Sequence, residues 1–66
     1  MKPRPADQTG ILMHEGGRLI LSMPSGGHWR IDLECRFDKA LIGAWVRVLG
    51  ERIEFNTIAA GSIEPA

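Results

Sequence analysis

The sequence predicts a small all-β barrel, and three features of its 66 residues indicate this fold class. Between His28 and Phe37, bulky apolar residues alternate strictly with polar ones, which is typical of an antiparallel strand with one buried face. Clusters of glycine with proline or serine separate the short apolar runs, as turns separate strands. A chain of this length forms one domain, and a single sheet hides its apolar face and its edges best by curling into a barrel.

The single domain is expected over residues 9–64, after a flexible N-terminal segment, residues 1–8, that holds two prolines. The first strand is predicted at residues 10–15 and the second at residues 18–23. The glycine pair at 16–17 joins them, because glycine reaches the positive φ that a two-residue hairpin turn needs. On the second strand, one face should carry Leu19, Leu21 and Met23, and the other should carry Arg18, Ile20 and Ser22.

The third strand, predicted at residues 28–36, carries the strict alternation and follows a turn at residues 24–27. The residues expected to point into the core are Trp29, Ile31 and Leu33. The pattern then changes over residues 38–43. There Asp38 is suited to cap one helical turn and Gly43 is suited to end it.

A fourth strand is predicted at residues 44–50, where apolar residues alternate again. Gly50 indicates a bend or bulge, and residues 51–55 are expected to continue the strand around this corner. The face expected to point inward carries Ala44, Val46 and Val48, and the opposite face carries Trp45, Arg47 and Leu49.

The closing strand is predicted at residues 57–64. Ile58 and Ile63 lie five positions apart, so they share a face only if the strand contains a bulge between them. Gly61 is the natural place for that bulge, because glycine in a strand pattern often marks one.

Three strands, one helical turn and two further strands follow one another in the order of the oligonucleotide/oligosaccharide-binding (OB) fold, a five-stranded Greek-key barrel. The sequence therefore predicts a five-stranded OB-like barrel with a one-turn helix between strands 3 and 4. The count becomes six strands if residues 51–55 form a separate one. The alternative is an SH3-like barrel, which has a similar size but usually places its helical turn before the last strand.

Two segments resemble known small domains. Residues 41–63 resemble the second half of small bacterial OB-type domains, and residues 17–34 are similar to a family of short bacterial proteins classed as domains of unknown function. In residues 41–63 the matching residues are Leu41, Gly43, Val46, Val48, Gly50, Ile58 and Ile63. The resemblance covers roughly residues 10–64 and implies the barrel fold. It carries no catalytic or ligand assignment, because the matching residues are glycines at bends and inward apolar side chains.

Composition narrows the functional classes. Eight basic residues balance eight acidic ones, so the chain has no long-range attraction for phosphate backbones or anionic lipid. Cys35 is the only cysteine, which excludes a disulfide within the chain and a thiolate zinc knuckle. The first ten residues lack the apolar core of a signal peptide, and the apolar runs are far shorter than a membrane span. We therefore expect a cytoplasmic protein without membrane contact.

The spacing of reactive side chains predicts no enzyme, cofactor or metal. His14, Glu15, His28 and Cys35 are the residues of ligand type that could cluster, but their spacing matches no metal motif. Residues 25–27 follow one strand and lead into another, so they form neither a nucleophile elbow nor a phosphate-binding loop before a helix.

Trp45 is the clearest candidate for contact with a partner. It is out of phase with Val46 and Val48, so we expect it to point outward, and an exposed tryptophan often marks a contact surface. The predicted function is a non-enzymatic binding or interaction module that contacts a protein partner or a second copy of the chain. The candidate residues are Arg18, Ile20, His28, Arg30, Trp45 and Arg47.

The alternative function is weak binding of single-stranded nucleic acid or oligosaccharide on the outer face of strands 2 and 3, which OB folds use for this purpose. Arg18 and Arg30 are predicted to lie on that face. Asp32 and Glu34 share the face with Arg30, so cross-strand pairing of opposite charges is the simpler account. For this reason the sequence does not favour nucleic-acid binding.

Overall fold

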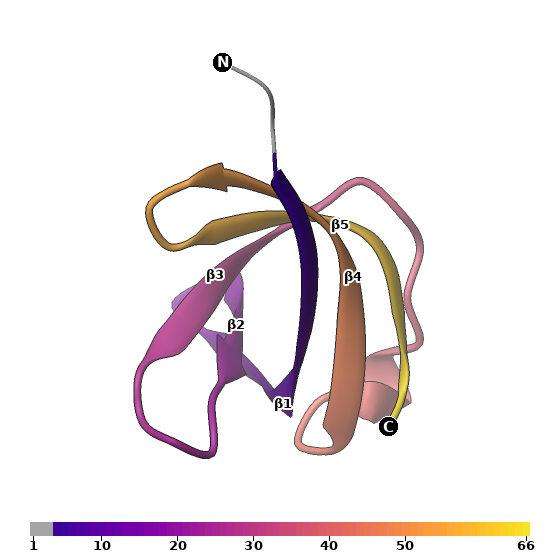
Figure 1. Ribbon diagram of the computed structural model, residues 1–66. Helices are drawn as coiled ribbons and strands as arrows, with labels where there is room; N and C mark the ends of the chain where they lie inside the picture. Colours follow the sequence, from indigo (N-terminus) through magenta and orange to yellow (C-terminus); the bar gives the residue numbers. More distant parts are fainter. Residues whose placement is uncertain (1–3) are drawn as a thin grey trace.

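The computed structural model describes residues 4–66 as a five-stranded barrel with one short 3-10 turn. The elements are β1 (Arg4–Glu15), β2 (Arg18–Ser22), β3 (His28–Leu33), the turn η1 (Lys39–Leu41), β4 (Trp45–Glu54) and β5 (Thr57–Pro65). The strands close into a ring in the order β1-β2-β3-β5-β4 (Figure 1). The predicted all-β class, and the helical turn between the third and fourth strands, are therefore confirmed.

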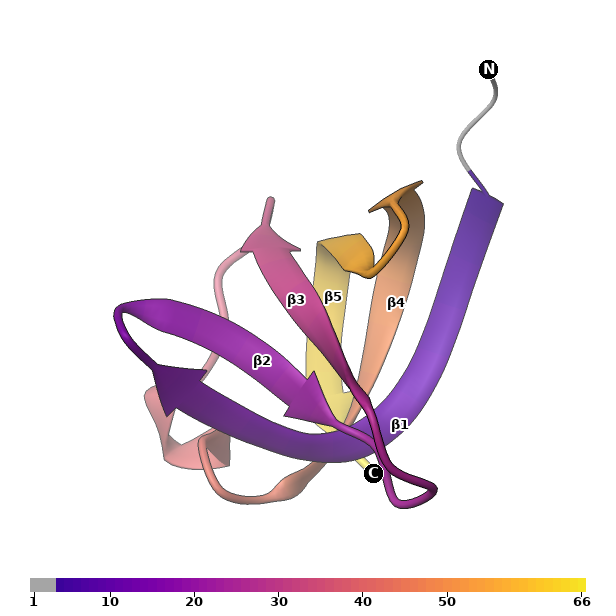
Figure 2. The same cartoon turned by 90° about the vertical axis from the view of Figure 1, so that its left-hand side faces the viewer.

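The ring closes through β1, which is long enough to pair with two strands. Neighbouring strands run antiparallel except β3 and β5, which are parallel. The first part of β1 pairs with β4 and its last part pairs with β2, because the strand bends sharply between them (Figure 2). Ile11 lies at this corner and faces Ser22 on one side and Trp45 on the other. Gly10 allows the bend, since a Cβ at that position would overlap the carbonyl oxygen of Ser22.

β1 begins earlier than the sequence predicted. Residues 4–8 do not form a loose segment but pair with β4, from Arg4 opposite Arg52 to Gln8 opposite Val48. Residues 1–3 lie outside the described residues. Pro5 is tolerated because this part of β1 has a strand on only one side, and a proline costs little at such an edge.

β3 ends at Leu33, earlier than predicted. Ile31 is buried and Trp29 packs half-buried against the core, as the alternation predicted. Leu33 is 37% exposed, so the prediction that it faces the core was wrong. The pairing of β2 with β3 stops at Leu19 opposite Ile31, and the barrel wall next to Leu33 is therefore missing on the β2 side.

The core is formed by the inward side chains of all five strands. On β2 and β4 the predicted inward faces are confirmed, because Leu21, Val46 and Val48 are fully buried and Leu19 nearly so. Burial of each such side chain stabilises the fold by about 1.5–3 kcal/mol relative to leaving it exposed. The buried core cluster is Leu12, Leu19, Leu21, Ile31, Val46, Val48, Ile58 and Ala60.

The predicted turns are also confirmed. Gly16 and Gly17 have φ values of 57° and 77° in the two-residue turn between β1 and β2. Asp38 caps η1 by accepting a hydrogen bond of 2.9 Å from the backbone N–H of Ala40. Gly43 follows the turn with a φ of 90°, which glycine adopts without the steric cost that a Cβ brings.

A bulge in β5 brings its two isoleucines to the core, as predicted. The pairing of β4 with β5 shifts by one residue next to Gly50, and Gly61 is the residue left without a partner. As a result Ile58 is fully buried and Ile63 packs against the core. Gly50 permits the two strands to approach, since a Cβ there would overlap the carbonyl oxygen of Ala59.

Candidate functional site

A groove of about 500 Å³ lies on the barrel surface between the β1–β2 turn and the β4–β5 turn. The start of β2, the second half of β3, the end of β4 and the start of β5 line it. We refer to it below as the groove. Its lining includes the side chains of Arg18, Arg30, Asp32, Leu33, Ile53 and Glu54.

The groove exists because β3 extends beyond its neighbour β2. On one side, β5 pairs with β3 as far as Leu33, which lies opposite Ala60. On the other side, the pairing of β2 with β3 ends where Leu19 lies opposite Ile31. Beyond this pair the β1–β2 hairpin projects away from the tip of β3 (Figure 2). The end of β3 therefore lies at the surface instead of inside the sheet.

Both signs of charge line the groove. Arg18 and Arg30 contribute guanidinium groups, and Asp32 and Glu54 contribute carboxylates. Within residues 4–66, the ion pairs are those of Arg47, at a different place on the barrel. The cross-strand pairing that the sequence analysis expected for Arg30 is therefore not formed in this part of the chain, and these charged groups remain available to a ligand.

Two exposed apolar side chains lie among these charges. Leu33 is 37% exposed and Ile53 is 46% exposed, and both line the groove. Leu33 is exposed because β2 does not cover it, and Ile53 lies at an irregularity where the β4–β5 pairing passes from Arg52 to Glu54. This combination of apolar and charged side chains in one groove resembles the composition of protein–protein contact surfaces.

Arg52 holds the β4–β5 turn beside the groove. Its Nε donates a hydrogen bond of 3.3 Å to the carbonyl oxygen of Glu54, and its Nη2 donates one of 3.0 Å to that of Phe55. The guanidinium carbon lies 5.7 Å from the centre of the Trp29 ring and 5.9 Å from that of Phe55. The Phe55 ring, although 86% exposed, is therefore attached to a fixed turn.

The sequence analysis did not identify this arginine–aromatic group. The two rings are 26 positions apart in the chain, and no local spacing relates them. They meet because the end of the β4–β5 hairpin lies beside the start of β3, where Asn56 accepts a hydrogen bond of 2.8 Å from the backbone N–H of Arg30. The same packing brings Ile53 and Glu54 to the groove, and the sequence pattern contained no signal for either of them.

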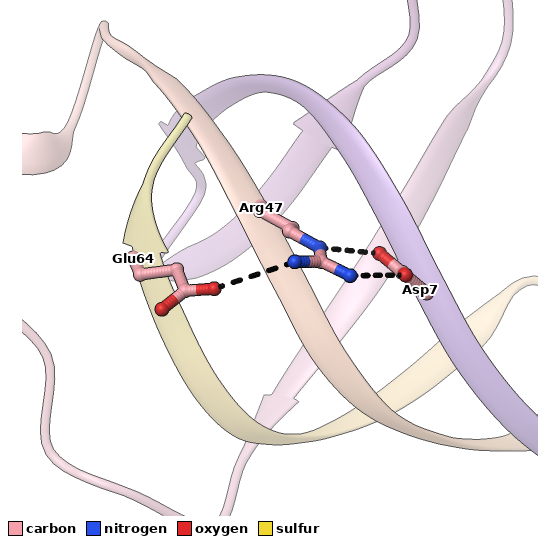
Figure 3. A network of polar contacts seen from close by, with 3 residues as sticks. All are labelled: Asp7, Arg47 and Glu64. Carbon is pink, nitrogen blue, oxygen red and sulfur yellow. Dashed lines mark hydrogen bonds and ion pairs between the residues drawn. The ribbon is translucent and has the colours of Figure 1, made fainter.

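Arg47, one of the predicted contact residues, is engaged within the protein. Its Nε and Nη2 donate hydrogen bonds of 2.9 and 2.7 Å to the carboxylate of Asp7, and its Nη1 lies 3.9 Å from Glu64 (Figure 3). These hydrogen bonds, with the positive charge of Arg47, hold the pKa of Asp7 below its ordinary value. The carboxylate in turn raises the pKa of Arg47. The side chain links β1, β4 and β5.

The other predicted residues fall in three places. Arg18 and Arg30 lie together in the groove. Ile20 and His28 line a smaller hollow of about 210 Å³ on the same sheet, and Ile20 lies directly opposite Arg30 in the β2–β3 register. Trp45 is 49% exposed and lies outside both hollows, beside Ile11.

Within the described residues, no group of three or more histidine, cysteine, aspartate or glutamate side chains is placed to hold a metal ion. Cys35 is a free, half-buried thiol. No helix in residues 4–66 has the length and apolar character needed to cross a membrane.

A comparison with protein-family models gives a match over most of the chain. The family model described as "Protein of unknown function (DUF5818)" matches residues 9–66. No curated protein and no solved structure gives a significant match. The family match confirms the resemblance to short domains of unknown function that the sequence analysis noted.

Proposed function

We propose that this chain, which belongs to the DUF5818 family of proteins of unknown function, is a non-enzymatic binding module that holds a protein partner in the groove across β3. The observation that carries the proposal is the groove itself. It combines exposed Leu33 and Ile53 with four charged side chains that have no ion-pair partner within residues 4–66.

We also propose that the barrel is OB-like. Its support is the ring order β1-β2-β3-β5-β4, the parallel pairing of β3 with β5, and the short helical turn between β3 and β4. OB folds bind ligands on the face of strands 2 and 3 and with the loops between strands 1–2 and 4–5. The groove lies between the two corresponding turns of this chain.

The chemistry of the groove supports a protein as the partner. Arg18 and Arg30 are balanced by Asp32 and Glu54, so the lining has no net charge. Contact surfaces between proteins combine an apolar centre with a polar rim, and a few aromatic or arginine anchors carry most of the binding energy. Phe55, held next to the groove by Arg52, is suited to be such an anchor.

A second copy of this chain is less well supported as the partner. Trp45 is 49% exposed, and Ile11, which lies opposite it in the β1–β4 register, is half-buried. One large aromatic side chain buries about 150–250 Å², whereas a stable interface buries about 800 Å² on each partner. The exposed face of one tryptophan by itself is therefore smaller than the surface that a stable dimer buries.

Binding of single-stranded nucleic acid is the second candidate, and the observation that favours it is that Arg18 and Arg30 line one groove. Two guanidinium groups there could contact neighbouring phosphates. The adjacent carboxylates of Asp32 and Glu54 would repel those phosphates, so we expect such binding to be weak and confined to low salt.

Amide NMR titration of the folded chain tests the proposal. Three probes are compared: 12-residue peptides selected by phage display on the folded chain, a dodecamer of deoxythymidine at low and moderate salt, and a neutral tetrasaccharide. We expect a selected peptide to shift the amides of Arg18, Arg30 and Ile53. Ile53→Ser should weaken peptide binding, and Trp45→Ser is the matched control that should not. Peptides that shift no groove amide would remove the proposal.

A further inference from the structure

The backbone of β3 alternates between its two neighbours, and this alternation defines which groups face the groove. Arg30 donates its N–H to the carbonyl oxygen of Asn56 at 2.8 Å, and Glu34 donates its N–H to that of Ala60 at 3.1 Å. Even-numbered residues of β3 therefore turn their N–H groups toward β5. Because backbone groups alternate along a strand, the N–H and C=O of odd-numbered residues point the other way, toward β2.

Within the described residues, β2 provides backbone partners for only two of these odd-numbered residues. It pairs with Trp29 through Leu21 and with Ile31 through Leu19. The next partner in this register would be Gly17 opposite Leu33, but Gly17 lies in the β1–β2 turn with a φ of 77°. Within residues 4–66, no backbone hydrogen bond joins these two residues. The N–H and C=O of Leu33 therefore face the groove without a strand beside them.

Resting on the function proposed above, we propose that the groove binds an extended peptide segment of the partner by strand addition next to Leu33. The segment continues the line of β2 along the end of β3. Its backbone accepts a hydrogen bond from the N–H of Leu33 and donates one to its C=O. In binding of this kind, main-chain hydrogen bonds contribute affinity and alternate side chains contribute specificity.

The lining of the groove specifies the chemistry of that segment. One apolar side chain is required to cover Leu33 and Ile53, which are exposed without a partner strand. Polar neighbours of both charge signs complement Arg18 on one wall and Glu54 on the other. An extended segment with one central apolar residue between an acidic and a basic residue fits these requirements, whereas a uniformly acidic or basic segment would be repelled by one pair of charges.

Removal of the Leu33 N–H tests strand addition directly. Leu33→Pro lacks this donor, and Leu33→Ala is its matched control, because both lose the leucine side chain. The ladder with β5 uses the even-numbered N–H groups, so proline at 33 does not remove one of its hydrogen bonds. A second variant carries N-methylleucine at position 33 and is made by joining synthetic residues 1–34 to residues 35–66 at Cys35. It keeps the side chain and blocks only the donor.

The probe is the tightest phage-selected 12-residue peptide, measured by calorimetry and by amide NMR. We expect Leu33→Pro to bind the peptide about tenfold more weakly than Leu33→Ala does. The N-methyl protein should bind it about tenfold more weakly than the wild type does. In both variants a carbonyl group of the bound peptide loses its hydrogen-bond donor. The Leu33 amide should exchange more slowly with solvent when the peptide is bound.

The outcomes separate the two proposals. Peptide-induced shifts at Arg18 and Ile53, together with unchanged affinity of the N-methyl protein, would overturn strand addition and leave the proposed binding groove intact. If no selected peptide shifts a groove amide in the wild-type chain, both proposals fail. If Leu33→Pro loses the dispersed NMR spectrum of the folded barrel, the N-methyl protein alone decides the question.

Discussion

Arg47 and Asp7 lie 40 positions apart in the chain and meet through two hydrogen bonds of 2.9 and 2.7 Å. The contact joins β1 to β4, which are the two strands that close the ring. Both side chains are about half exposed, so water screens their attraction and the pair contributes only modestly to stability. It shows that residues 4–8 belong to the barrel wall.

Asp7→Asn tests this pair through pH. The depressed pKa of Asp7 means that the carboxylate stabilises the fold above its ordinary pKa of 3.8, and that this contribution disappears as the pH falls through the lower pKa of the folded state. We expect the wild type to melt slightly above Asp7→Asn at pH 6 and the difference to vanish at the acid end of a series of thermal melts. A difference that grew on acidification would contradict this sign. Asp38→Asn is the control, because Asp38 forms no contact with Arg47.

Gly50→Ala should destabilise the barrel by about 1–3 kcal/mol, because the new Cβ would overlap the Ala59 carbonyl and force β4 and β5 apart. Gly61→Ala is the matched control in the same bulge. A Cβ at Gly61 would meet its nearest atom, the carbonyl oxygen of Leu49, at an ordinary 3.7 Å. Urea unfolding measures both variants, and equal losses of stability would argue against the close approach at Gly50.

Leu33→Ala and Leu21→Ala should lower the free energy of unfolding by different amounts, although both leucines lie in strands where apolar and polar residues alternate. Leu21 is fully buried, so its truncation should cost about 2–5 kcal/mol. Leu33 is 37% exposed at the open end of β3, and we expect its truncation to cost about 1–1.5 kcal/mol. Denaturant unfolding of the two variants measures this difference. A large loss in Leu33→Ala would restore the original prediction that this side chain faces the core.

Arg52→Ala should loosen the β4–β5 turn, because Arg52 donates hydrogen bonds to the carbonyl oxygens of Glu54 and Phe55. In a Trp45→Phe background, where Trp29 is the remaining tryptophan, we expect a changed emission spectrum and faster amide exchange near Phe55. Arg52→Lys keeps the charge but lacks the forked donors, so it should restore little of the exchange protection. Full protection in the lysine variant would show that the charge alone holds the turn.

The sequence was sufficient to predict the strands, turns and bulge that depend on interactions between residues close together in the chain. Two-residue alternation identified β2 and β4 and their inward faces, and positive-φ glycines identified the turn at residues 16–17. The five-position spacing of Ile58 and Ile63 located the bulge at Gly61. Each of these features depends on steric or hydrophobic constraints that act between residues close together in the chain.

The candidate site was predictable only in part. Arg18 and Arg30 were placed on one face from their strand parity, and both line the groove. Ile53 and Glu54 reach it from another hairpin, and their positions depend on how far β4 and β5 extend before they turn. Arg47 was predicted as a contact residue, but the strand that carries its partner Asp7 was not recognised.

By itself, the sequence determined which segments form strands, where the chain turns, and which side chains of most strands point inward, because these properties follow from local sterics and from the burial of alternate apolar residues. Only the tertiary structure decided where β1 begins, where the pairing of β2 with β3 stops, and which charged groups meet. Those features depend on which strand lies next to which after the ring closes. Leu33 illustrates the difference, since it continues the alternation perfectly and is nevertheless exposed, because the neighbouring strand has already ended.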